Sequence, residues 1–282
     1  MPTRVNAVVY IQFDFRKRLC MSEGLDRTIL ASPPLVVTLA QVRFEERGEL
    51  AEASVASALR EPMAAHGLTS ASQVHVQQVV FGASDAGPEA EASAKVAAGW
   101  QFKAPGDAVV VTVLRDQMSL EVKRYPGWDA FLEIWQTCVG GVLGIVKPEL
   151  VTRLGLRYVN RVKPRDAADA AGWENKGLVD PPFLGPAVGS VLSRYVTAAE
   201  GRAAMAFDDG VEALVHHGVV PEGEGQVFML DIDCFTTRAD DFSAETLSAR
   251  LRALNDHSLE VFQEVVKEQL RAEMMGAKGE VL

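Results

Sequence analysis

The chain has 282 residues, which suits one large domain or two domains of about 150 residues each. Asp and Glu outnumber Lys and Arg by 38 to 28, so the formal net charge is −10. A content of 48% hydrophobic and 23% charged residues excludes global disorder and a collagen-like chain. The acidic balance argues against a broad nucleic-acid surface, because affinity for DNA rests mainly on Lys and Arg.

Residues 1–31 form an N-terminal extension that leaves two interpretations open. Apolar and polar residues alternate from Val5 to Phe15, which is typical of a half-buried strand. Met21 starts a more conventional polar sequence and is the alternative site of initiation. The segment lacks the cleavage site of a signal peptide, and no apolar run in the chain reaches the ~18 residues of a membrane helix. We therefore expect a cytoplasmic protein without a membrane partner.

Residues 32–163 are predicted to form a first α+β half. A strand over residues 35–45 is followed by a helix over 48–67, a strand over 73–81 and a mobile surface loop over 82–99. Three short strands between residues 100 and 125 predict an antiparallel meander. The Tyr125-Pro126-Gly127-Trp128 corner then starts a helix, in which we expect Trp128 and Trp135 to be largely buried. Three glycines near residue 140 predict an early helix end or close contact with a neighbouring backbone.

Residues 164–186 are rich in Pro, Gly and Asp and are predicted to be a linker, followed by a second α+β half over 187–282. Strands are expected at 188–198, 202–207, 211–217 and 226–236. Ser243 is the expected cap of a long terminal helix. Its predicted buried stripe consists of Leu247, Leu251, Leu254, Phe262, Val265 and Leu270.

The element order of the second half partly repeats that of the first. The predicted fold is therefore α+β, with two antiparallel-sheet halves, each covered by helices on one face, and with a possible internal duplication. No matching residues support the duplication beyond this order.

Three arginines dominate the strand that precedes the predicted linker. A period of two places Arg153, Arg157 and Arg161 on one face, with Gly155 between the first two. Guanidinium groups bind phosphate and carboxylate through two parallel hydrogen bonds, so this row is a candidate ligand-binding face for an anion. Arg157 is central, and the missing side chain at Gly155 leaves room for a planar anion. The alternative is a solvated face whose arginines pair with neighbouring acids.

Asp231 and Asp233 lie two residues apart on the strand over residues 226–236, so their carboxylates share one face about 7 Å apart. Such a pair can hold a divalent cation or divide acid and base roles, which makes a metal-dependent hydrolase the alternative function, with these two aspartates as candidate catalytic residues. The spacing fixes no third ligand. The competing interpretation is that both face water or the arginine row.

Other reactive residues carry no recognisable site. The adjacent His216 and His217 point to opposite faces of a strand, and Cys138 and Cys234 lie in apolar surroundings that disfavour a nucleophilic thiolate. The cysteines show no C-x-x-C pair, and the chain has no P-loop, dinucleotide-binding, G-x-S-x-G or H-E-x-x-H motif. We therefore predict no cofactor and no metal site.

The Tyr125-Pro126-Gly127-Trp128 corner and the later stretch from Arg153 to Arg161, RLGLRYVNR, together form a recognisable pattern. With Pro33-Pro34 before the first strand and Phe262 in the last helix, the chain resembles a sporadically distributed family of uncharacterised bacterial proteins with a YPGW and RxGLRYxNR signature. The resemblance covers about Ser32 to Met274. It implies no catalytic residues, and its patchy distribution suggests a link to bacterial defence or toxin–antitoxin systems.

These observations favour a cytoplasmic binding or regulatory protein rather than an enzyme. The expected contact surface is the face of Arg153, Arg157 and Arg161. Its expected partner is an anionic small molecule or an acidic protein, and a homodimer is a further possibility.

Overall fold

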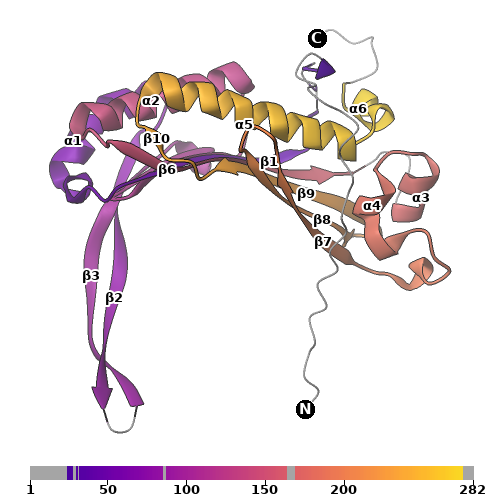
Figure 1. The fold of residues 1–282 in the computed structure, drawn as a ribbon, viewed down its shortest axis with the longest axis horizontal. Coiled ribbons are helices and arrows are strands. Elements are labelled where there is room, and N and C mark those ends of the chain that lie inside the picture. The colour runs from indigo at the N-terminus through magenta and orange to yellow at the C-terminus, as the bar shows by residue number, and fades with distance from the viewer. Residues whose placement is uncertain (1–23, 28–29, 31, 85–86, 164–168, 276–282) are drawn as a thin grey trace. The chain divides into compact units, whose positions relative to one another are not determined.

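The computed structural model describes residues 24–27, 30, 32–84, 87–163 and 169–275, without the side chains of residues 78–94 (Figure 1). The questions of the N-terminal strand and of Met1 or Met21 as the first residue lie outside this part. The described residues form an α+β fold with an antiparallel sheet, which confirms the predicted class. None of their helices combines the length and apolar character needed to cross a membrane.

Contacts divide the chain into two compact units. Unit 2 consists of Leu35–Asn160 together with Cys234–Asn255, and unit 1 takes the remaining described residues. This division differs from the expected boundaries at 163 and 187, because a C-terminal segment belongs to the same unit as the first half. The internal duplication is not confirmed.

Unit 2 is built on six strands in the order β2-β3-β4-β5-β1-β6, with the short β10 beside β6. The pairings between these neighbours are antiparallel. The bounds are β1 Leu35–Phe44, β2 Ser70–Ser84, β3 Gly87–Lys103, β4 Val109–Leu114, β5 Gln117–Val122, β6 Leu150–Val162 and β10 Asp240–Asp241. The strand over 35–45 and the meander are thereby confirmed.

Helices cover one face of this sheet (Figure 1). They are α1 (Ala53–Ala64), α2 (Trp128–Ile145) and the first part of α5 (Ala244–Val265), and a 3-10 helix, Gly48–Ala51, precedes α1. Alternation along the strands turns apolar side chains toward the helices, and the fully buried core includes Phe102, Leu120, Phe131, Trp135, Leu154 and Leu156. The opposite face, here called the open face, carries the other set of side chains.

The prediction of a surface loop over residues 82–99 is wrong. Residues from Gly87 onward form β3, which pairs with β2 in a long antiparallel hairpin with register shifts beside His75 and Phe81. From Glu89 to Val96 polar residues alternate with alanine or valine, which is the period of a strand, but the small size of these apolar residues and the Gly and Pro before them favoured a loop. Backbone pairing with β2 orders the segment.

Helix α2 also differs from expectation, since it continues through all three glycines to Ile145. A Cβ at Gly141 would lie 2.7 Å from Leu59 Cδ2, so the close contact is with a side chain of α1 and not with a backbone. Trp135 is buried as predicted, but Trp128 is only half-buried and stacks on Phe131.

Unit 1 contains the strands β9, β8 and β7 in that order. Their bounds are β7 Ala199–Ala206, β8 Glu212–Glu222 and β9 Gly225–Thr236, the last of which ends in unit 2. The expected strand over 188–198 is absent, because those residues form turns and the 3-10 helix Ser193–Tyr195. The other three predicted strands are present.

The segment predicted to be a linker is partly structured. Residues 164–168 lie outside the described part, but α3 (Ala170–Asn175) and α4 (Pro181–Leu184) follow, with the 3-10 helix Gly185–Ala187 after them. Trp173, Leu178, Val179 and Phe183 are buried, because these apolar residues among the prolines belong to the core of unit 1. A linker would leave them in water.

The terminal helix is confirmed, with its cap and its buried stripe. The backbone N–H of Thr246 donates to Ser243 Oγ at 3.1 Å. The helix ends at Val265, and a second helix, α6 (Glu268–Met274), carries the last stripe residue, Leu270.

Candidate functional site

The arginine-bearing strand β6 alternates as predicted. Leu154 and Leu156 are fully buried on the helix-covered face, while Arg157 and Arg161 are exposed and Arg153 is half-buried. The three arginines therefore share one side of the strand. Their surroundings, however, differ from one residue to the next.

Arg153 is held in place by its own unit. Its Nη1 donates to Gln41 Oε1 at 3.2 Å, and its guanidinium carbon lies 4.7 Å from the centre of the Phe235 ring. The guanidinium also occupies the space above Gly155, where an added Cβ would lie 2.5 Å from Arg153 Nη1. The expectation that Gly155 leaves room for a planar anion is thus wrong, because the Arg153 guanidinium fills that space.

Arg161 belongs to unit 1 and forms an ion pair with Glu222, to which Lys163 Nζ also donates at 3.3 Å. Desolvation acts to raise the pKa of Glu222, but the hydrogen bonds from these two cations lower it below its ordinary value. This is the alternative that the sequence left open, an arginine paired with a neighbouring acid.

Arg157, the central arginine, is exposed on the open face of unit 2 opposite Leu39 of β1. It is not free of interaction partners. The three arginines therefore form a row along β6 but not a single pocket.

The registers place a second feature across the strands, which we call the polar row. Gly155 lies opposite Gln41, which lies opposite Ser119, and the alignment continues across β4, β3 and β2. The members of the polar row are Gly155, Gln41, Ser119, Thr112, Gln101 and Ser72, one from each of six strands. Gln101 Nε2 donates to Thr112 Oγ1 at 3.2 Å, so neighbouring amides and hydroxyls are ordered along it.

Cations flank the polar row. On one side of the polar row, the next line of residues across the strands contains Arg157, Glu121 and Lys103. On the other side, Arg43 lies opposite Arg153. Arg43 is exposed and makes no ion pair with any described residue. Four cations and one carboxylate of the strands thus lie beside the polar row, and a second carboxylate, Asp107 Oδ2, lies 3.5 Å from Lys103 Nζ. The cations remain in excess, the reverse of the balance of the whole chain.

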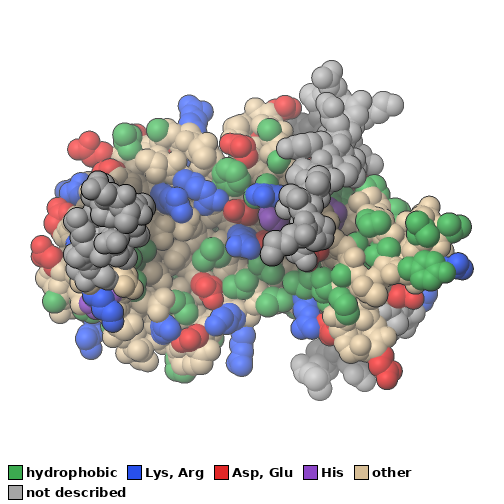
Figure 2. Space-filling view, turned by 90° about the horizontal axis from the view of Figure 1, so that it is seen from below, with side chains coloured by type: hydrophobic (Ala, Val, Ile, Leu, Met, Phe, Trp, Pro, Cys, Tyr) green, Lys and Arg blue, Asp and Glu red, His purple; other side chains and the backbone are tan. Residues whose placement is uncertain are grey.

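Figure 2 shows the molecule from below the view of Figure 1, which for unit 2 is the side opposite α1, α2 and α5. Blue Lys and Arg side chains and tan polar surface are prominent over the part that carries the hairpin. Sequence reasoning found Arg153 and Arg157 but missed Arg43 and the polar row, because both depend on the registers between strands. The polar positions of each strand were visible; their alignment was not.

Asp231 and Asp233 are half-buried on one face of β9, between the buried Leu230, Ile232 and Cys234. The predicted alternation is confirmed. Neither aspartate is free of interaction partners, and no group of three or more His, Cys, Asp and Glu side chains suited to a metal ion occurs among the described residues. The structure thus adds no third ligand to the pair.

The Tyr125-Pro126-Gly127-Trp128 corner and the stretch from Arg153 to Arg161 meet inside unit 2. The rings of Tyr125 and Tyr158 lie edge to face at 6.0 Å, and Tyr158 Oη donates to Asn255 Oδ1 at 2.7 Å. Burial raises the pKa of the Tyr158 hydroxyl well above its ordinary value, with the nearby Tyr125 adding to the rise. These residues join the β5–α2 corner to β6 and α5, which is a structural role.

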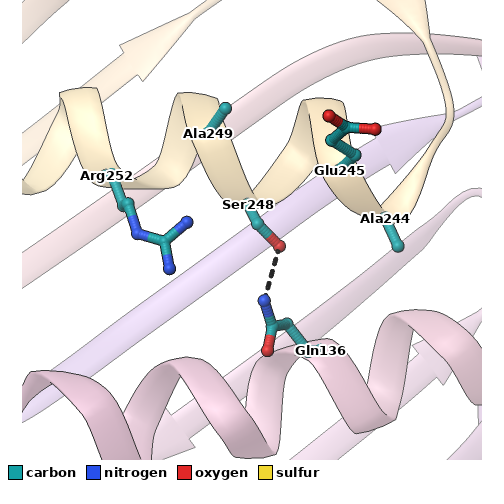
Figure 3. A pocket seen from close by; sticks show the side chains of 6 residues that line it. All are labelled: Gln136, Ala244, Glu245, Ser248, Ala249 and Arg252. Carbon is teal, nitrogen blue, oxygen red and sulfur yellow. Dashed lines mark hydrogen bonds between the residues drawn. The ribbon is translucent and has the colours of Figure 1, made fainter.

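A shallow cavity of about 420 Å³ lies between α2 and α5 (Figure 3). Gln136 points across it and donates from Nε2 to Ser248 Oγ at 3.2 Å. The other lining residues are Ala244, Glu245, Ala249 and Arg252. It lies on the helical side of unit 2 and contains none of the residues that the sequence singled out.

Comparison with known proteins does not identify the chain. No family model and no curated protein matches it. A solved structure of the RNA triphosphatase Pct1 of S. pombe aligns over 95% of this chain and 94% of its own, at 9% identity and a TM-score of 0.11. A similarity this low supports no statement about fold or activity.

Proposed function

We propose that the protein is a binding or regulatory protein and that the open face of unit 2 takes an extended acidic segment of a partner protein. The observation that carries this proposal is the polar row of six strands with Arg43, Arg153, Arg157 and Lys103 beside it. Arginine and lysine attract carboxylates, and the amides and hydroxyls between them hydrogen-bond to a peptide backbone.

The dimensions of the face favour a polypeptide over a small anion. Six strands about 4.8 Å apart span roughly 24 Å, the length of about seven residues of extended chain. Small ligands are usually enclosed in a concave pocket, whereas the cations here are spread along a sheet. Binding of a small anion in place of a polypeptide is therefore one outcome that the experiment distinguishes.

Charge supports the same choice. The chain carries a net charge of −10, so a local excess of cations directs an acidic partner to this face and away from the rest of the surface. The described cysteines, Cys138 and Cys234, are buried thiols that form no disulfide, as is typical of a protein that resides in a reducing compartment. We therefore place the proposed interaction in the cytoplasm.

The test compares Arg43→Glu with Arg60→Glu. Both residues are exposed and both substitutions change the charge equally, but Arg60 lies on α1, on the helix-covered side. Binding of a ten-residue oligoglutamate, inorganic phosphate and citrate would be measured by calorimetry at low and moderate salt.

We expect oligoglutamate to bind the parent and Arg60→Glu, and to bind Arg43→Glu at least about tenfold more weakly, with affinity falling as salt rises. Binding of phosphate or citrate with no binding of oligoglutamate would replace the protein partner with a small anion. Equal binding by both variants, or none by the parent, would refute the proposal.

A further inference from the structure

The edge strand β7 of unit 1 carries an interaction surface that the open face does not involve. β7 is the last strand in the order β9-β8-β7, so it pairs with a strand on only one side among the described residues. Its pairing with β8 runs from Ala199 to Ala206 without a bulge. The strand contains no Pro and no Lys, two of the features by which proteins commonly block an edge.

The free hydrogen-bonding groups of this edge can be assigned. The N–H of Phe207 donates to Val211 O across the β7–β8 turn, so the odd-numbered residues of β7 direct their backbone groups toward β8. Glu200, Arg202, Ala204 and Ala206 therefore direct theirs away from β8. Each of these four residues is exposed.

We propose that β7 pairs antiparallel with β7 of a second copy of this chain, with Glu200 opposite Arg202 of that copy. Two-fold symmetry repeats this contact, so two ion pairs form around an axis at Gly201. The paired residues are both even-numbered, as the direction of the free backbone groups requires. A continuous sheet then crosses the two copies.

Charge selects this register over its neighbours. A shift by one residue in each copy places Glu200 opposite Glu200, or Arg202 opposite Arg202, and like charges directly opposite one another are unfavourable. The longest register that pairs even-numbered with even-numbered residues, which overlaps Glu200 to Ala206, places both charged residues opposite alanine. Only the register with Glu200 opposite Arg202 is self-complementary in charge.

An apolar turn precedes the edge and adds to the surface. Val191, Leu192 and Tyr195 expose 83%, 64% and 68% of their surface, the largest fractions for large hydrophobic side chains in the described residues. In an antiparallel pair, the start of one β7 lies near the end of the other, so this turn packs against the β7–β8 turn of the second copy. The dimer thereby covers a hydrophobic patch that a monomer leaves in water.

The test measures the mass of the full chain by sedimentation velocity over a wide range of concentrations. We expect the parent to be a dimer that dissociates on dilution, and Arg202→Glu to raise the dissociation constant about tenfold or more. The swapped variant, Glu200→Arg with Arg202→Glu, should recover most of the affinity because the two ion pairs are restored with their partners exchanged. Arg60→Glu, on α1 of unit 2, should dissociate like the parent.

Circular dichroism shows whether each variant is folded. A parent that is monomeric at every concentration would overturn the proposal. A folded Arg202→Glu variant with the affinity of the parent would overturn it as well, as would a swapped variant that stays as weak as Arg202→Glu. The oligoglutamate binding of the open face is a separate measurement, so either proposal can fail without the other.

Discussion

At the scale of single residues, Tyr158 connects β6 to α5 through its hydroxyl group. Its hydroxyl is 2.7 Å from Asn255 Oδ1 and the residue is 9% exposed. Tyr158→Phe leaves the amide oxygen without its donor, so the free energy of unfolding should fall by about 1–2 kcal/mol. Urea denaturation measures this loss, and Tyr195→Phe, at an exposed ring, serves as the control. An unchanged midpoint for Tyr158→Phe would contradict the structural role.

His217 gives a prediction about pH. Its Nδ1 lies 2.7 Å from the carbonyl oxygen of Phe183, so Nδ1 carries the proton and donates it. Burial lowers the pKa of His217 below 6.5, since it outweighs the opposing effect of this hydrogen bond, and the neighbouring His216 lowers it further. The unfolded chain therefore binds the proton more readily than the folded one.

It follows that His217 contributes stability in full above pH 6.5 and loses that contribution as the pH falls through this value. The free energy of unfolding should thus decrease between pH 7.5 and 5.5, and less so in His217→Gln, whose amide can still donate to Phe183. His75→Gln, at an exposed site on β2, should retain the dependence of the parent. Parallel curves for His217→Gln and the parent would assign the effect to another group.

At the scale of elements, the three glycines of α2 separate helix propensity from packing. Alanine is about 1 kcal/mol more favourable than glycine inside a helix. A Cβ at Gly140 or Gly144 meets nothing within 4 Å, whereas at Gly141 it meets Leu59, which is fully buried against α2. Gly144→Ala should therefore raise the unfolding free energy by about 1 kcal/mol. Gly141→Ala should raise it less or lower it, and an equal gain in both would contradict the close contact.

The start of α5 provides a prediction of similar size. Ser243 Oγ accepts the N–H of Thr246, so Ser243→Ala should cost about 1 kcal/mol, while Ser243→Asp should keep the cap. Thermal melts of the three proteins measure the difference. A Ser243→Ala variant that melts like the parent would show that the cap contributes nothing.

The elements also show which parts of the structure the sequence could predict. Strong alternation gave β1 and β6, and the helical spacing of Leu247, Leu251 and Leu254 gave α5. β3 was missed because the apolar positions of its first half are alanines, which gave the alternation with polar residues too little weight. The polar row was missed for a related reason. Each of its members is an ordinary polar residue, and only long-range registers bring Ser72 and Gly155 onto one line.

At the scale of the whole molecule, the chain is not divided where its composition changes. The proline-rich segment after residue 163 contributes Trp173 and Phe183 to the core of unit 1, whereas Cys234–Asn255 returns to unit 2. Composition reports how polar a segment is, but not which earlier residues it packs against. The boundary between the two units therefore follows from long-range contacts and not from local composition.

This discontinuity predicts that residues 32–163 do not fold alone. Without the C-terminal segment, Phe44 loses its edge-to-face contact with Phe242, at 5.3 Å, and the face covered by α5 is exposed to water. Phe242, Leu247, Leu251 and Leu254 are each 6% exposed or less. At about 1.5–3 kcal/mol for each buried side chain, their loss amounts to roughly 6–12 kcal/mol, comparable with the whole stability of a typical domain.

The 32–163 fragment should therefore melt without a cooperative transition, as followed by circular dichroism. A synthetic peptide of residues 234–265, added in excess, should restore the transition because it supplies β10 and α5. The same peptide with Leu247 and Leu251 replaced by Ser is the matched control and should not restore it. A cooperative melt of the fragment alone would show that the first half is an independent domain after all, and that the helix-covered face can be stabilised by α1 and α2 without α5.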